Sequence, residues 1–577
     1  MTARAVAALL LCAAAAGAGE LTRRSDRSLE RVQQGGPPRY DLDFLLADLI
    51  PQPGRRFTEF SGDLSGRYLD ALAAAGAPES LRLLVPRVLA LQRPDGGFAN
   101  PLSGGGVVDD DMARVWGHGR LLVGLLAAAE STGDERALAA ARRLGDFLTD
   151  VAPRFNDDRV EAEFGQGKLA HGYICWTQNL EGLARLYGAT GEARYLEAAR
   201  AMAQRVERRP GQHSHGYLTS VRGLLALAQA SGEEAYRTKA EEAWDALAAS
   251  ENVLPTGTIP EYFAPGIGRD EGCSDADWVR LSLSLYRRTG RERYLEAAET
   301  AVFNAFFLNQ FSSGDFGHVE LAHDGLGYGV ARAWWCCTLH GLRAFSAIRE
   351  GAFQSDGAAL RYVLPVDGEG SAEGLTLRAD AELAQQATVR FEVVAAPEGR
   401  ARLEIRQPAW SGPLETDFPT EPRDGAVAFD RVWRVGEAFT IRYAPLERRE
   451  GGMLFLGPWL LAASEAAAPA FFDEPHEGNR LLWETLAPAD RPSRRRVDYI
   501  PAGYPEQVQS LTLRPLAERF EGPDGLRWQW KFREQESRAE RTAKRLVEQS
   551  RGRLLPFGVG LAAGALLMGL LWPRRQR

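Results

Sequence analysis

The chain has no excess of basic residues. Its 69 lysines and arginines are outnumbered by 77 aspartates and glutamates, which gives a formal net charge of −8. Because both signs are spread along the sequence, there is no basic stripe that could follow a phosphate backbone. We therefore expect no nucleic acid partner.

The length and composition are those of a globular protein with more than one domain. The 577 residues are 45% hydrophobic and 25% charged, which is typical of folded rather than disordered chains. A chain of this length exceeds one ordinary core, so at least two domains are expected. The sequence does not indicate the oligomeric state.

Both ends of the chain carry apolar runs. The opening MTARAVAALLLCAAAAGAGE places Arg4 before a short apolar stretch that ends in small residues, which is typical of a secretory signal peptide at 1–19. Residues 554–572 contain no charge. At about 1.5 Å per residue they are long enough for a hydrocarbon core of roughly 30 Å. A transmembrane helix is predicted there, with a buried apolar helix and a cleaved sorting tail as alternatives.

These two segments together predict the localisation. Arginines at 574, 575 and 577 follow the apolar run and fit the cytoplasmic side of a membrane. The segment 535–553 is charged and has no glycine before Gly552, which indicates a helical stalk. The prediction is an exported protein that is anchored in the membrane through its C-terminal helix, with the catalytic domain on the extracytoplasmic side.

Residues 20–350 are dominated by a recurring phrase that predicts helix, tight turn and helix. Each copy has a glycine where a helix end needs a left-handed residue, followed by acidic residues that suit the start of the next helix. The turn glycines are Gly133, Gly191, Gly232 and Gly290. Their unequal spacing favours a closed (α/α)6 helical barrel over an open solenoid, which keeps a stricter period.

After Glu350 the sequence changes to short β-rich runs separated by glycine, proline and aspartate. LRYVLPV, ATVRFEVVA and FTIRYAPL are examples. They predict a β-sandwich domain over 351–534. The predicted fold class is thus multidomain α plus β, with an (α/α)6 barrel, a β-sandwich region and a C-terminal transmembrane helix.

Seven of the eight histidines lie in the helical region, several of them beside glycines. Loops at one end of a helical barrel converge on its mouth, so these imidazoles could line a polar pocket that holds sugar hydroxyls. For any single histidine, a hydrogen-bonded structural role is the alternative. The candidates for substrate binding are His118, His171, His213 and His215.

Cysteine is scarce, and three of the five cysteines have distinctive neighbours. Cys336 and Cys337 are adjacent, and a disulfide between neighbours closes a strained ring, so thiolates on one metal are more natural. Glu271 and Cys273 alternate about a glycine, which lets both side chains point the same way. One carboxylate and three thiolates suit tetrahedral zinc. The alternative is a disulfide between Cys273 and one of the pair. For Cys175 a buried packing role is expected.

The stretch from Thr256 to Arg343 is similar to the core of glycoside hydrolase family 127, the β-L-arabinofuranosidase-like family. It contains TGTIPEYFAPGIGRDEGCSDADW, GDFGH and WWCCTLHGLR. Downstream, ARLEIRQPAWSG and FLGPWLLA resemble sandwich segments of the same family, so the resemblance covers most of residues 90–465. The Glu-x-Cys element combined with Cys-Cys is its specific part.

The resemblance implies roles for individual residues. Glu271, Cys273, Cys336 and Cys337 would bind Zn²⁺, and Cys336 would also be the nucleophile. A glutamate upstream of Glu-x-Cys would be the general acid/base. Glu261 is the candidate, although its spacing is shorter than the family pattern, and Glu320 is the alternative.

The implied activity is retaining hydrolysis of terminal glycosyl residues of a carbohydrate substrate, with β-L-arabinofuranosyl as the suggested sugar. Zinc coordination would deprotonate the sulfur, and the glutamate would first donate a proton and then activate water. Two alternatives stay open, an inactive membrane-tethered carbohydrate-binding protein and a polysaccharide lyase. A pure binder has no need of the metal-binding set, and a lyase leaves the cysteines unexplained.

Overall fold

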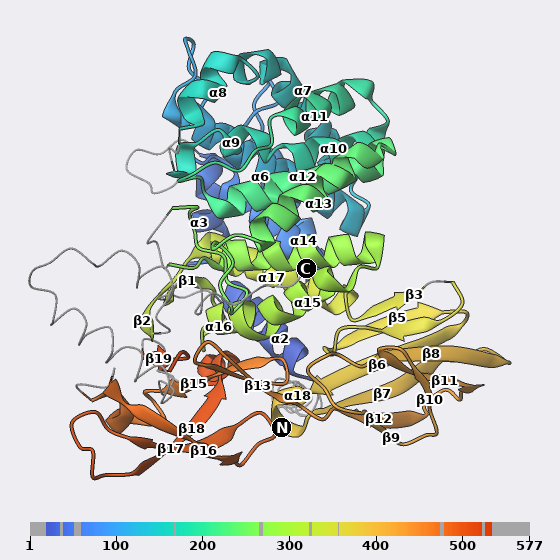
Figure 1. The fold of residues 1–577 in the computed structure, drawn as a ribbon. Helices are drawn as coiled ribbons and strands as arrows, with labels where there is room; N and C mark the ends of the chain where they lie inside the picture. The colour runs from blue at the N-terminus through green and yellow to red at the C-terminus, as the bar shows by residue number, and fades with distance from the viewer. Residues whose placement is uncertain are drawn as a thin grey trace, which may run out of the picture. The chain divides into compact units, whose positions relative to one another are not determined.

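The computed structural model describes residues 19–34, 39–50, 59–166, 169–264, 269–321, 326–355, 357–473, 478–521 and 526–532. This part of the chain is α plus β. Helices dominate as far as Glu350 and strands dominate after it (Figure 1).

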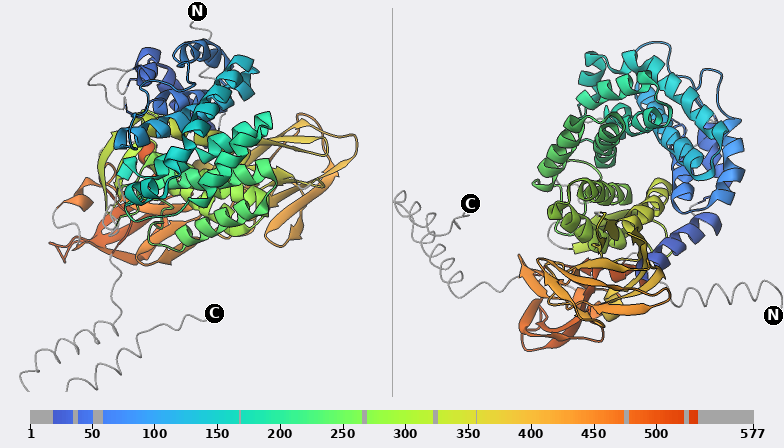
Figure 2. Two further views of the ribbon diagram at one scale, coloured as in Figure 1. Left: turned by 90° about the horizontal axis from the view of Figure 1, so that it is seen from above. Right: turned by 90° about the vertical axis from the view of Figure 1, so that its right-hand side faces the viewer.

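Six inner helices of the described residues contact one another in succession and close a ring, because the last returns to the first. They are α4 (Asp63–Ala74), α6 (Asp109–Thr132), α10 (Leu180–Thr190), α12 (Ser214–Ser231), α14 (Gly272–Thr289) and α17 (Trp335–Glu350). The right-hand view of Figure 2 looks down the axis of this ring.

Each inner helix packs against an outer helix. In the same order these are α5 (Pro78–Leu89), α7 (Glu135–Phe155), α11 (Ala193–Gln204), α13 (Glu234–Ala248), α15 (Glu292–Thr300) and α2 (Glu20–Gln34). The last pair brings the start of the described chain against α17, so the sixth pair joins segments that are about 300 residues apart in sequence.

The four turn glycines lie where the recurring phrase predicts them, each at the end of an inner helix. Gly133, Gly191, Gly232 and Gly290 have φ angles of 68°, 71°, 74° and 64°. The amide of each donates to the carbonyl four residues earlier, as in the bond from Gly191 N to Tyr187 O at 2.7 Å. These left-handed caps turn the chain from the inner layer to the outer layer.

The strands form three sheets. One five-stranded sheet has the order β5 (Gly368–Ala372), β6 (Leu375–Glu382), β7 (Thr388–Ala395), β12 (Ala438–Arg442), β9 (Glu415–Thr416). A second has the order β10 (Glu421–Arg423), β11 (Ala426–Val432), β8 (Arg400–Arg406), β4 (Leu360–Tyr362), β3 (Phe353–Ser355). The Tyr362 and Phe391 rings, one from each sheet, have centroids 4.9 Å apart, so the two sheets pack face to face.

The third sheet combines two strands from the helical part of the chain, before Glu350, with strands from the part after it. It has the order β1 (Gly317–Leu321), β2 (Leu326–Ala333), β19 (Trp528–Gln529), β15 (Trp459–Ser464), β18 (Gln509–Pro515), β17 (Arg495–Ile500), β16 (Arg480–Pro488). Strand β14 (Met453–Leu456) pairs with β15, and β13 (Glu447–Glu450) pairs with β14. A hairpin inserted between helices of the ring thus pairs with the last described strand. The domain boundaries drawn from the sequence stay predictions.

The membrane part of the predicted fold class needs correction. No helix in the described residues is long and apolar enough to cross a membrane. Even α6, with 24 residues, carries charged side chains at 109, 110, 111, 114, 120 and 130. The predicted stalk and membrane span, 535–553 and 554–572, lie outside the described residues, as do 1–18 of the predicted signal peptide. The predicted membrane-anchored localisation and membrane partner rested on that span and are corrected with it.

Candidate active site

The amino-terminal ends of four inner helices, α4, α12, α14 and α17, carry several of the polar residues of the site, including all four predicted metal ligands. Glu271 is the N-cap of α14 in extended backbone, and Cys273 lies in the first turn. Cys336 and Cys337 lie in the first turn of α17 after the extended Trp334. The partial positive charge of helix amino termini favours anionic sulfur and carboxylate at these positions.

Gly272 allows the close approach that this arrangement needs. A Cβ at Gly272 would lie 2.6 Å from Asn309 Oδ1. That oxygen accepts the amide of Gly317 at 2.9 Å, and Asn309 Nδ2 donates to Asp270 Oδ2 at 3.1 Å. The glycine of the Glu-x-Cys element is therefore required by packing against Asn309.

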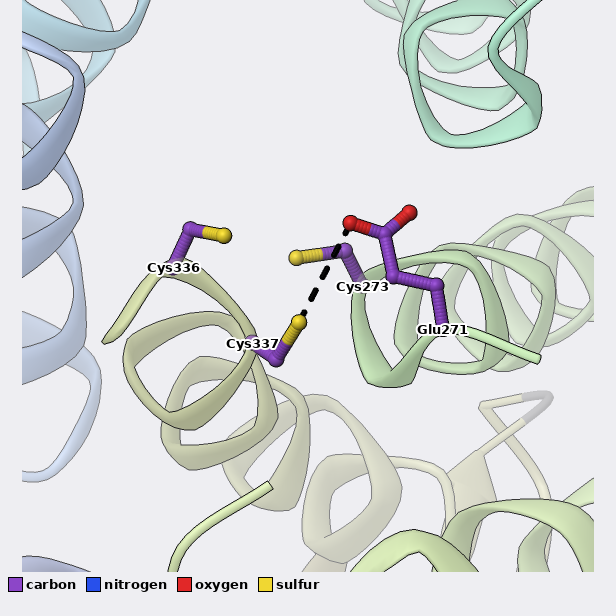
Figure 3. A group of neighbouring side chains, drawn as sticks. All are labelled: Glu271, Cys273, Cys336 and Cys337. Carbon is purple, nitrogen blue, oxygen red and sulfur yellow. Dashed lines mark hydrogen bonds between the residues drawn. The ribbon is translucent and has the colours of Figure 1, made fainter. Parts of the chain in front are cut away.

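The structure brings together the four predicted metal ligands. One ligand atom from each of Glu271, Cys273, Cys336 and Cys337 lies within 4.8 Å of all the others (Figure 3). Cys337 Sγ is 3.9 Å from Glu271 Oε1. Ligands of a tetrahedral zinc, at about 2.0–2.3 Å from the ion, lie roughly 3.3–3.8 Å apart, so small side-chain adjustments suffice. The cluster is a candidate metal site.

The cysteines of the described residues are free thiols. The alternative of a disulfide between Cys273 and one of the adjacent pair is therefore not what the structure contains. Cys175 is buried in α9 (Ile174–Thr177), where Sγ contacts Ala170 O at 3.0 Å.

A cavity of about 340 Å³ opens beside the cluster. Cys336 and Glu271 line it, whereas Cys273 and Cys337 are fully buried and do not. Other polar lining residues include His171, His213, His215 and Glu261. Aromatic lining comes from Phe60, Trp116, Tyr262 and Trp334. One sulfur of the three is thus presented to a ligand.

The thiols differ in acidity. Hydrogen bonds from the Cys273 and Cys337 thiols hold the pKa of Cys336 well below its usual range, and the Arg67 charge acts in the same direction. Burial raises the pKa of Cys273 and that of Cys337 well above the usual range. In the metal-free chain the sulfur that faces the cavity is therefore the most acidic of the three.

His213 and Glu271 form an ion pair at the cavity wall, with His213 Nε2 3.2 Å from Glu271 Oε2. Burial alone would lower the pKa of His213, but the Glu271 carboxylate raises it above its ordinary value. Burial would likewise raise the pKa of Glu271, but His213 lowers it. The imidazolium and carboxylate therefore stabilise each other.

His215 lines the same cavity and belongs to a second polar group with Asp277 and His340. Their ligand atoms also lie within 4.8 Å of one another. However, Asp277 Oδ2 accepts from His215 Nδ1 at 2.6 Å, and Asp277 Oδ1 accepts from Arg222 at 2.8 Å. A cation here would have to displace a buried arginine, so this group is better explained as a hydrogen-bonded network.

His118, which is predicted to bind substrate, is not among the residues that line the cavity, and its substrate-binding role stays a prediction. It lies inside α6, where Nδ1 donates to Arg114 O at 2.6 Å and Nε2 accepts from Phe98 N at 3.0 Å. Burial lowers its pKa to about 4. Both nitrogens are engaged, Nδ1 within α6 and Nε2 with the loop before it, which favours the alternative of a structural role.

Glu261 lines the cavity between two short backbone bridges, from Pro260 to Asp270 and from Tyr262 to His213. Its carboxylate pairs with Arg269 and lies 3.7 Å from His318 Nε2. Glu320, the alternative acid/base, is in β1, where its backbone pairs with Tyr328.

Several cavity residues were not singled out from the sequence. Arg67, Asp63 and Arg269 line the cavity, and His318 was noted only as one histidine among seven. Asp63 and Arg67 are paired at a spacing of four residues in α4. That spacing also occurs on ordinary helix surfaces, so it carries no signal specific to a site.

Comparisons with known proteins agree with the geometry. A family model described as "Beta-L-arabinofuranosidase, GH127 catalytic domain" matches residues 58–350, which is half of the chain. All four predicted metal ligands, from Glu271 to Cys337, lie within this range. A search of curated proteins finds no match.

Solved structures are similar to this chain over most of their length. A GH127 β-L-arabinofuranosidase from Geobacillus stearothermophilus T6 is 14% identical with a TM-score of 0.65, covering 88% of this chain and 98% of its own. A GH127 β-arabinofuranosidase is 14% identical with a TM-score of 0.61, covering 88% and 92%. A third, described as a glycoside hydrolase, is 15% identical with a TM-score of 0.59, covering 83% and 95%. At these identities the likeness establishes the fold.

Proposed function

The chain belongs to the GH127 β-L-arabinofuranosidase family and is a glycosidase, and from this premise we propose that it is a retaining enzyme with a cysteine nucleophile. Cys336 attacks the sugar, and Glu261 is the general acid/base. Glu271, Cys273, Cys336 and Cys337 hold zinc. The substrate is a terminal glycosyl residue of a glycan, with β-L-arabinofuranosyl as the first candidate because the similar structures are described as arabinofuranosidases.

One observation carries the proposal. Of the three clustered sulfurs, Cys336 alone lines the cavity, and it shares that cavity with Glu261. A structural metal site would be closed on all sides, whereas a nucleophile has to reach the ligand. The cluster meets this requirement with one open sulfur and two enclosed ones.

The donor set fits zinc in type and in spacing. Three sulfurs and one carboxylate are ligands that select zinc over harder cations such as magnesium or calcium. When bound, zinc supplies the charge that keeps the sulfurs deprotonated. By ligand counting the assembly carries a net charge of about −2, which leaves Cys336 electron-rich enough to attack an anomeric carbon.

The reaction follows double-displacement logic. Cys336 Sγ forms a bond to the anomeric carbon while the bond to the leaving oxygen breaks, and Glu261 in its protonated form gives that oxygen a proton. A water molecule then attacks the thioglycosyl carbon, Glu261 takes its proton, and the sulfur leaves. Two inversions retain the anomeric configuration.

The size of the cavity favours a single terminal sugar. Its volume of about 340 Å³ is at the small end of the range of about 300–1,000 Å³ for ligand pockets. His171 and His213 supply polar contacts to hydroxyls, and the aromatic wall supplies faces on which a ring can stack.

The test measures zinc content and hydrolysis of a panel of aryl glycosides, including the β-L-arabinofuranoside, by the wild type and by Cys336→Ser. Cys175→Ser is the matched control, because Cys175 is a buried cysteine outside the cluster. We expect activity on at least one glycoside that is lost in Cys336→Ser and kept in Cys175→Ser. Hydrolysis that survives in Cys336→Ser would contradict the proposed nucleophile.

A further inference from the structure

Arg67 is a buried cation in direct contact with the sulfur cluster. It is 4% exposed. Its Nε donates to Asp63 Oδ1 at 2.8 Å, and Nη1 lies 3.7 Å from Cys273 Sγ. Its Nη2 lies 2.8 Å from His215 Nε2. The guanidinium is therefore fixed from three sides while it lines the cavity next to Cys336.

The contact with His215 requires one tautomer of that imidazole. His215 Nδ1 is 2.6 Å from Asp277 Oδ2, and an ionised carboxylate can only accept, so Nδ1 carries the proton. Nε2 then presents a lone pair, which is what the N–H of Arg67 needs. Asp277 is itself held by Thr219 Oγ1 at 2.9 Å and by Arg222 at 2.8 Å.

These contacts form a chain of positioning across the ring. Asp277 is on α14, His215 on α12 and Arg67 on α4. Three inner helices thus contribute to the orientation of one guanidinium. The Asp277 carboxylate sets the His215 tautomer, and the His215 lone pair sets the direction of Arg67.

The cluster needs a counter-charge. Three thiolates and a carboxylate exceed the charge of a divalent ion by about two. Helix amino termini compensate about half a charge each, and the effect falls off within one turn. A guanidinium in contact with Cys273 Sγ contributes a whole charge, and it keeps that charge at any physiological pH.

We propose that Arg67 is a positioning residue of the metal centre, held by Asp63 and by the Asp277–His215 pair so that its charge compensates the sulfurs and lets one ion bind all three as thiolates. The inference rests on the proposed function, because it takes the cluster as a zinc site. It adds a residue that does not bind the metal but determines how tightly the metal is held.

The test compares zinc affinity of the full chain by competition with a chromophoric chelator, for the wild type and for Arg67→Met, which replaces the aliphatic stem but removes the charge. We expect Arg67→Met to bind zinc about 10–100-fold more weakly, as is usual when a partner of a metal ligand is removed. With cobalt in place of zinc, the sulfur-to-cobalt charge-transfer band should also lose intensity, because fewer thiolates bind.

Arg280→Met is the matched control. Arg280 is a buried arginine of the same network. Its Nη1 lies 3.4 Å from His340 Nε2 and 3.6 Å from Asp277 Oδ1. None of the described hydrogen bonds joins it to Cys273 or Cys336. Its replacement disturbs the buried charges to a similar extent without touching sulfur. We expect the zinc affinity of Arg280→Met to stay within about threefold of the wild type, below the smallest effect of losing a metal-ligand partner.

Two results overturn the inference. One is wild-type zinc affinity in Arg67→Met, and the other is an equal loss in Arg280→Met, which would indicate general damage to the network. If Arg67→Met does not fold, His215→Leu takes its place, because it removes the acceptor that orients Arg67, and unchanged affinity there also overturns it. If the wild-type chain binds neither zinc nor cobalt through sulfur, the proposed function is contradicted instead. Failure of the proposed function is thus distinguishable from failure of the role inferred for Arg67.

Discussion

Cys336 and Cys337 are neighbours in the chain, but their sulfurs have different surroundings. Cys336 is partly exposed and lines the cavity, whereas Cys337 is fully buried and does not line it. Successive residues of a helix point about 100° apart, so two adjacent cysteines in the first turn of α17 can reach one ion from different sides. The pair provides one enclosed ligand and one open sulfur.

This difference predicts opposite effects on metal content. Cys337→Ser removes an enclosed ligand, so we expect loss of zinc together with activity. Cys336→Ser also leaves three ligands, but position 336 faces the cavity, where water can take the fourth position of the ion. This variant should therefore retain zinc while losing activity on the order of 10³-fold or more, as expected for loss of a nucleophile. Metal analysis after gel filtration, combined with aryl glycoside turnover, separates the two variants. Equal zinc loss in both would argue against distinct roles.

The helix pairs of the ring could be predicted because their signals are local. A glycine such as Gly191, which needs a left-handed backbone, and the acidic residues after it act within one turn of the chain. The metal cluster could be predicted because adjacent cysteines together with a Glu-x-Cys element leave few other chemical uses. Both predictions depended on residue type and short spacing.

Other features have no local signal. Arg67 contacts Cys273 across 206 residues of sequence, and β2 pairs with β19 across about 200 residues. His118 looked like a loop residue because glycines flank it, but Gly117 and Gly119 lie within α6. There, a Cβ at Gly117 would lie 2.3 Å from Ser61 O. These glycines provide close helix packing rather than a turn, and one sequence does not distinguish the two uses.

Two glycines, one inside α10 and one at its C-cap, predict opposite stability changes. Gly191 has a φ of 71° with nothing within 4 Å of an added Cβ, so Gly191→Ala should destabilise by about 1–2 kcal/mol through backbone strain alone. Gly188 lies three residues earlier inside the helix, where an added Cβ would meet Ala230 Cβ at 3.8 Å. Gly188→Ala should stabilise by roughly 0.5–1 kcal/mol. Denaturant unfolding of both variants checks the signs, and a stabilised Gly191→Ala would contradict the assigned cap.

The His213–Glu271 pair predicts a pH window for stability of the metal-free chain. The folded pKa of His213 is raised above 6.5, so its contribution is complete below that value and is lost as pH rises through the raised pKa. The folded pKa of Glu271 is lowered below 4.5, so its contribution is present above that value and is lost as pH falls. The stabilisation is therefore greatest between about pH 4.5 and 6.5.

Urea unfolding of the zinc-free wild type and His213→Gln checks this window. We expect the variant to lose about 2 kcal/mol at pH 5.5, as is typical of hydrogen bonds to charged groups, and clearly less at pH 9. Tyr262→Phe is a suitable control, because it alters a neighbouring cavity residue without removing a charge at these pH values. A stability difference between wild type and His213→Gln that grows with pH would contradict the raised pKa of His213.

Glu261→Gln tests the acid/base through its dependence on the leaving group. The amide cannot donate a proton to the departing oxygen, so hydrolysis of glycosides with poor leaving groups should fall by about 10²–10⁴-fold. Glycosides with a good leaving group, such as a dinitrophenol, need no protonation in the first step, so formation of the Cys336 intermediate should be nearly unaffected and seen as a burst before slow turnover. Glu242→Gln, an exposed glutamate on α13, is the control and should behave as wild type. Equal losses for good and poor leaving groups would show that Glu261 does not supply the proton, and Glu320→Gln would then be the variant expected to show the leaving-group dependence.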